Sequence, residues 1–92
     1  MKANEKYSKR KASCLQPGWV IRMNDLRLGD MGYERVTAQR YPTVHGMILS
    51  VKPHPDRQVL TISVEGRVFS DYYLNDENVN VVQWSITNMS KE

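Results

Sequence analysis

The sequence is poor in cysteine, since its 92 residues include only Cys14. A single thiol forms no internal disulfide and supplies no cysteine-rich zinc site, which suits a reducing compartment. Long apolar runs are also missing, because no segment approaches the roughly 18 apolar residues of a membrane-spanning helix. The charged N-terminus lacks the apolar stretch of a signal peptide. We therefore expect a soluble cytoplasmic protein with no membrane partner.

Patterns that carry catalysis or bind metals are scarce as well. The residues of types that ligate zinc include His45, His54, Asp56 and Cys14. No recognised ligand spacing joins them, so ordinary surface histidines are favoured over a metal site. Cys14 has no histidine near it in the sequence to act as its base. These patterns predict a non-enzymatic protein with no catalytic residue, no metal and no cofactor.

The sequence does have an uneven charge. The formal net charge is +3, and residues 1–13 carry five basic side chains against one acidic side chain. The same segment has too few apolar groups to repay the entropy of ordering it. We therefore expect residues 1–16 to form a flexible basic arm, which can neutralise phosphates without recognising a base sequence.

The clearest structural signal is a β-hairpin over residues 58–74. Two apolar-rich runs flank Glu65-Gly66, a two-residue loop that supplies the positive φ of a tight turn. Such a loop fixes the register, because a slip by one residue turns every side chain to the other face. The predicted cross-strand pairs are Val64 with Arg67, Ile62 with Phe69, and Leu60 with Asp71.

Asp71 is the exception in this hairpin, because the register places its carboxylate on the core face. We expect a β-bulge there, which returns Tyr72 and Leu74 to the core. The alternative is that Asp71 lies at an open end of the sheet and pairs with a cation.

The remaining elements follow from alternation and turn residues. Trp19–Met23 predicts a first strand, and Val44–Lys52 predicts a central strand with a bulge or sharp bend at Gly46. One 3₁₀ turn is expected over residues 74–78, then a last strand over residues 78–83 and a polar tail over residues 85–92.

This order resembles the SH3-like small β-barrel over residues 17–84, in the segments WVIRM, HGMILSV, VLTISVEGRVFSDYYL and LNDENVNVV. The resemblance implies an all-β fold, a small five-stranded barrel with a long first loop over residues 24–42 and one 3₁₀ turn before the last strand. It is a likeness of fold and carries over no functional residue. An OB-like five-stranded barrel is the alternative.

Small barrels of this class act mainly as binding modules, which favours binding over catalysis. Arginines beside tyrosines can stack on bases, and the same composition suits a protein-binding surface. We therefore expect an accessory protein of the kind common in phages and mobile elements, which contacts nucleic acid or a nucleoprotein complex. The alternative is a protein-only module, an inhibitor or regulator of a partner enzyme or an assembly subunit. The predicted contact residues are Lys6, Lys9, Arg10 and Lys11 in the arm, and Tyr33, Arg35, Arg40 and Tyr41 in the long loop.

Overall fold

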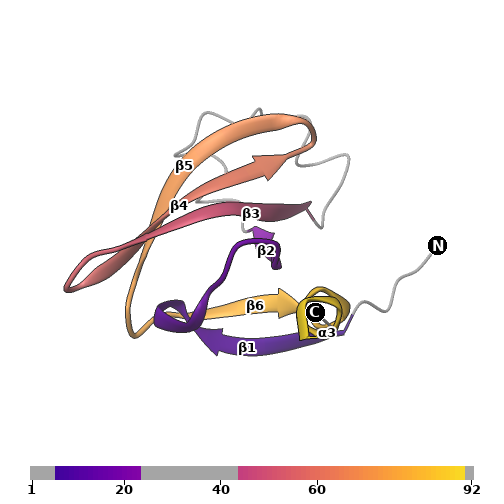
Figure 1. Ribbon diagram of the computed structural model, residues 1–92, viewed down its shortest axis with the longest axis horizontal. Coiled ribbons are helices and arrows are strands. Elements are labelled where there is room, and N and C mark those ends of the chain that lie inside the picture. The colour runs from indigo at the N-terminus through magenta and orange to yellow at the C-terminus, as the bar shows by residue number, and fades with distance from the viewer. Residues whose placement is uncertain (1–5, 24–43, 91–92) are drawn as a thin grey trace.

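The structure is a computed structural model that describes residues 6–23 and 44–90. These residues are mostly in β-strands, which confirms the all-β class (Figure 1). The elements are β1 (Tyr7–Lys11), the 3₁₀ helix η1 (Ala12–Cys14), β2 (Val20–Met23), β3 (Val44–Pro53), β4 (Arg57–Val64), β5 (Arg67–Leu74), β6 (Asn78–Val82) and helix α3 (Gln83–Ser90).

The described strands form one antiparallel sheet in the order β1-β6-β2-β3-β4-β5. Figure 1 shows the sheet folded over on itself, with β3, β4 and β5 in one layer and β1 and β6 in the other. The predicted five strands are β2 to β6, and β1 is a sixth strand. β1 and β5 are the terminal strands of this sheet and do not pair with each other, so the sheet is not a closed barrel.

Strand β1 overturns the prediction of a flexible arm over residues 7–16. All five residues of β1 pair with β6, from Tyr7 opposite Val82 to Lys11 opposite Asn78. The next residue, Ala12, is fully buried, and its backbone N–H donates to the Glu77 carbonyl at 2.9 Å. The prediction was wrong because it considered only apolar side chains. Backbone pairing with β6 and the burial of Ala12 and Leu15, which follow β1, hold the strand instead.

The core lies on the inner face of the folded sheet. Its fully buried side chains include Ile21, Ile48, Leu60, Ile62 and Val81, which come from β2, β3, β4 and β6. Alternation in β4 is strict, with every second residue from Gln58 to Val64 buried. This pattern is the one expected of strands with one face on a core.

Gly46 has a different role from the one predicted. The irregularity in β3 lies between Ile48 and Ser50, where the register with β4 shifts, and not at Gly46. A Cβ placed on Gly46 meets Cγ2 of Ile62 at 2.5 Å. Glycine is therefore required at this position because the Ile62 side chain occupies the space beside it.

The β4–β5 hairpin has the predicted register, with Ile62 opposite Phe69 and Val64 opposite Arg67. Glu65 has φ 49° and Gly66 has φ 81°, as a two-residue turn between twisted strands requires. The sequence therefore predicted both the turn and the pairing.

The bulge predicted at Asp71 is wrong. Asp71 remains opposite Leu60, and the outward-facing Tyr72 and Leu74 are 48% and 47% exposed. The Asp71 carboxylate accepts a hydrogen bond from the Tyr72 backbone N–H at 2.8 Å. The carboxylate is thus satisfied at the edge of the sheet, so the strand has no need to bulge.

The turn after β5 lies where the single 3₁₀ turn is predicted. The Glu77 N–H donates to the Leu74 carbonyl at 2.9 Å, which is an i→i+3 bond that closes one four-residue turn. The 3₁₀ helix η1 lies elsewhere, near the N-terminus.

The predicted polar tail over residues 85–92 is helical as far as it is described, because helix α3 extends through Ser90. Ser85 holds its start in place: the Ser85 hydroxyl donates to the Val82 carbonyl at 2.7 Å and accepts from the Val20 N–H at 3.0 Å. Ile86 packs against the core. The sequence signal was weak because the start of the helix is held by residues far away in the chain, Val20 through the Ser85 hydroxyl and Lys6 through the Gln83 N–H.

Candidate nucleic-acid interface

The outer faces of β1, β6 and β2 form one continuous surface, because these strands are neighbours in the sheet. Val81 and Ile21 are opposite each other and fully buried, so the residues that alternate with them face outward. We call this surface, with its one neighbour from β3, the outer face. Its residues are Tyr7, Lys9 and Lys11 of β1, Asn78, Asn80 and Val82 of β6, Arg22 of β2 and His45 of β3.

Tyr7 contacts two other residues of the outer face, His45 and Arg22. Its hydroxyl group and Nε2 of His45 are joined by a hydrogen bond of 2.8 Å. The guanidinium carbon of Arg22 lies 6.0 Å from the centre of the Tyr7 ring, within the range of a cation–π contact. Because β6 and β2 lie between β1 and β3, the Tyr7 side chain must cross them on the outer side. Val82 lies opposite Tyr7 on this side and is only 1% exposed.

Lys9 and Lys11 project from β1 on the same side as Tyr7. Both are exposed, and they lie opposite Asn80 and Asn78 of β6. The Lys11 Nζ donates to the Asp76 carbonyl at 3.3 Å. Two ammonium groups beside two amide side chains give a surface that can bind an anion and also offer neutral hydrogen-bonding groups.

Charge is separated along the sheet. Residues 6–23 contain five basic and no acidic side chains, and residues 78–90 contain no charged side chain. All the acidic side chains of the described residues lie from residue 56 to residue 77, in β5 and in the turns beside β4 and β5. Since β1, β6 and β2 are neighbours, the positive charge is concentrated at one end of the sheet, as a surface that binds phosphate requires.

The structure separates the predicted arm residues into two groups. Lys9 and Lys11 are together on the outer face, whereas Arg10 lies opposite the buried Val79 on the other side of β1. Arg10 donates from Nε to the Ser8 hydroxyl at 2.9 Å, and its guanidinium lies 5.6 Å from the centre of the Trp19 ring. Arg10 is therefore a packing residue beside Trp19 in this structure.

Lys6 precedes β1 and is exposed, and its backbone carbonyl accepts a hydrogen bond from Gln83 at 2.8 Å. The other predicted contact residues, Tyr33, Arg35, Arg40 and Tyr41, lie outside the described residues.

Sequence reasoning missed Tyr7, Arg22, His45, Asn78 and Asn80. A signal for part of this set was present, because Tyr7, Lys9 and Lys11 follow one another at every second residue. That spacing is typical of one face of a strand. The contribution of β2 and β3 had no such signal, since it depends on which strands become neighbours.

Comparison of the chain with protein-family models, curated protein sequences and solved structures finds no match.

The side chains of types that ligate zinc do not come together in the described part of the structure, and two of them, His45 and Asp56, bond to other residues. Within residues 6–23 and 44–90, no three His, Cys, Asp or Glu side chains are grouped as metal ligands. Asp56 pairs with Arg57 at 2.9 Å between Oδ2 and Nη2. The hydrogen bond from Arg57 lowers the pKa of the Asp56 carboxyl group below its ordinary value.

The same described residues include no helix with the length and apolar character to cross a membrane.

A second surface covers the outer side of β3, β4 and β5 and differs in chemistry. Its exposed apolar side chains include Met47, Val68, Tyr72 and Leu74. The Arg57 guanidinium lies 4.7 Å from the centre of the Tyr72 ring. Met47 and Val68 both lie opposite Ser63, so apolar and small polar groups are mixed on this side. Such a surface suits a protein partner better than it suits phosphate.

Proposed function

We propose that this protein is a non-enzymatic binding module that contacts nucleic acid, alone or within a nucleoprotein complex, through its outer face. Lys9, Lys11 and Arg22 neutralise phosphates. The side-chain amides of Asn78 and Asn80, which lie beside these cations, donate hydrogen bonds to sugar or phosphate oxygens. The observation that carries this proposal is the charge separation, with the described acidic side chains confined to residues 56–77. A surface of this kind binds without strong preference for a base sequence.

The SH3-like barrel also belongs to this proposal. Strands β2 to β6 follow one another in the order expected of that fold, and η1 packs against β4 and β5. That contact bridges the two layers of the folded sheet, and it supports an open variant of a small barrel in which β1 is an additional strand. An accessory role in the cytoplasm, of the kind common in phages and mobile elements, fits such a module.

The proposal is tested by salt-dependent binding. We expect the full chain to bind mixed-sequence DNA or RNA at low salt, measured by fluorescence anisotropy. Each phosphate contact contributes roughly 0.7–0.9 to the slope of log affinity against log salt. Lys9→Ala combined with Lys11→Ala should therefore flatten the slope by about 1.5.

The matched control is Lys52→Ala, which removes an exposed lysine from β3 on the other layer of the sheet. It should leave the slope unchanged. Equal losses for Lys52→Ala and for the β1 variants, or no binding at low salt, would contradict the proposal.

The second candidate function is a protein-only interaction, as an inhibitor or regulator of a partner enzyme or as an assembly subunit. The apolar outer side of β3, β4 and β5 favours it, because Met47, Tyr72 and Leu74 are each close to half exposed. If Leu74→Lys abolished binding to a protein partner and left the affinity for nucleic acid unchanged, that side of the sheet would be assigned to the protein partner.

A further inference from the structure

Strand β5 leaves one of its backbone edges without a neighbouring strand, because it is the terminal strand of the described sheet. The two-residue loop makes Val64 and Arg67 a hydrogen-bonded pair, and the pairs alternate from there. The backbone groups of Val68, Ser70, Tyr72 and Leu74 therefore point away from β4. Exposed edges of this kind pair readily with another strand.

Two of these four outward backbone N–H groups already donate hydrogen bonds within the chain. The Tyr72 N–H donates to the Asp71 carboxylate at 2.8 Å, and the Leu74 N–H donates to the Glu77 carboxylate at 2.9 Å. Within residues 6–23 and 44–90, no such acceptor lies against the N–H of Val68 or of Ser70. Among the described residues, the half of β5 next to the hairpin turn is thus open for pairing, and there Val68 is 64% exposed.

We propose that the open half of β5 pairs with β5 of a second copy of this chain, antiparallel, about a two-fold axis at Phe69. In this register Val68 and Ser70 of each copy exchange backbone hydrogen bonds with Ser70 and Val68 of the other. Arg67 then lies opposite Asp71 of the second copy, and the two Phe69 rings are cross-strand neighbours. Opposite charges and aromatic rings at such positions stabilise strand pairs.

Neighbouring registers fit less well. With the axis at Ser70, Val68 faces Tyr72 of the second copy, whose N–H is already bonded to Asp71. With the axis at Val68, Glu65 faces Asp71 of the second copy, and two like charges oppose each other. The symmetric placement of Arg67 and Asp71 about Phe69 is what identifies a second copy as the partner, because the strand is then complementary to itself.

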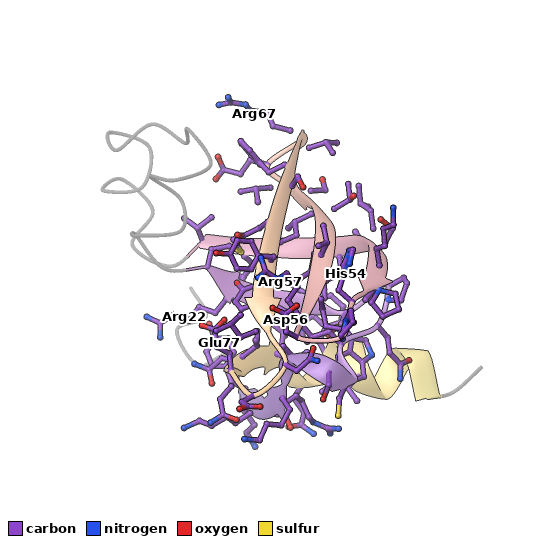
Figure 2. All side chains as sticks on the ribbon, turned by 90° about the vertical axis from the view of Figure 1, so that its left-hand side faces the viewer. Arg22, His54, Asp56, Arg57, Arg67 and Glu77 are labelled. Atoms are coloured by element: carbon purple, nitrogen blue, oxygen red, sulfur yellow. The ribbon has the colours of Figure 1, made fainter. Side chains whose placement is uncertain are left out.

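Arg67 is placed to make this contact. It lies at the tip of the hairpin and projects away from the body of the molecule (Figure 2), with its guanidinium 5.2 Å from the centre of its own Phe69 ring. The outer face is at the other end of the strand order and stays accessible in such a dimer. The inference is therefore independent of the proposed nucleic-acid function.

The first test compares Ser70→Pro with Ser70→Ala in the full chain, by sedimentation over a range of concentrations. The Ser70 N–H points away from β4, so proline removes no hydrogen bond within the monomer but blocks pairing of the two edges. We expect the wild type and Ser70→Ala to approach twice the monomer mass of 10.7 kDa as concentration rises. Ser70→Pro should weaken the dimer at least about thirtyfold, because both copies lose a backbone donor at the interface.

The second test exchanges the charges. Arg67→Asp alone and Asp71→Arg alone each place like charges opposite one another and should weaken the dimer about tenfold, whereas the double variant should restore it. Circular dichroism checks that each variant is folded, and the nucleic-acid affinity of Ser70→Pro is measured in parallel. A monomer at every concentration, equal dimerisation of the proline and alanine variants, or no rescue by the double exchange would overturn the proposal.

Discussion

At the scale of the residue, Gly46 determines how closely the side chains of β3 and β4 approach. The Ile62 side chain occupies the space that a larger residue at position 46 needs, with 2.5 Å between an ideal Cβ and Cγ2 of Ile62. Both residues are buried, so neither can move into solvent. We predict that Gly46→Ala lowers the free energy of unfolding by about 1–3 kcal/mol, the usual cost of overpacking a core. Urea denaturation followed by circular dichroism measures this difference.

Gly66→Ala is the control for this substitution. A Cβ at Gly66 has no neighbour within 4 Å, so only its φ of 81° disfavours alanine. Its cost should be about 1 kcal/mol, from backbone conformation alone. Gly46→Ala with unchanged stability would show that β3 and β4 are further apart than the structure has them.

At the scale of the element, η1 and the residue that opens it connect β1 to the core. Ala12 is fully buried, while the adjacent Ser13 is exposed. We predict that Ala12→Asp destabilises the protein by at least about 3 kcal/mol, because an unpaired carboxylate enters the core. Ser13→Asp should change stability by less than about 0.5 kcal/mol. Thermal melts of the two variants side by side make the comparison, and similar midpoints would mean that β1 is not held as described.

The elements that the sequence predicted well are those with local causes. The hairpin follows from a turn at Glu65-Gly66 and strict alternation on either side of it, and its register was correct. Strand β1 depends on a partner far away in the chain, β6, and its own residues carry no apolar alternation. Arg22 and His45 were not predicted as part of the outer face because only the order of the strands in the sheet places them beside Tyr7. A sequence without an alignment contains no direct signal for such pairing.

At the scale of the whole molecule, the charge separation predicts where a nucleic acid lies on the surface. We expect NMR signals of residues in β1, β6 and β2 to shift on addition of a short DNA or RNA duplex at low salt, because the basic side chains lie on those strands. Signals of the β4–β5 hairpin should remain in place. Shifts centred on the hairpin, with β1 unaffected, would instead assign the binding surface to the apolar side of the sheet.

The pairing of β1 with β6 also dictates when the outer face can form. Tyr7 and Val82 are opposite each other although most of the chain separates them. During synthesis the β4–β5 hairpin can close soon after it emerges from the ribosome, because its contacts are between nearby residues. Strand β1 can pair only after β6 has been synthesised. A nascent or truncated chain therefore carries the lysines of β1 without the surface that orients them, and the proposed binding of nucleic acid requires a chain in which β1 and β6 are both present.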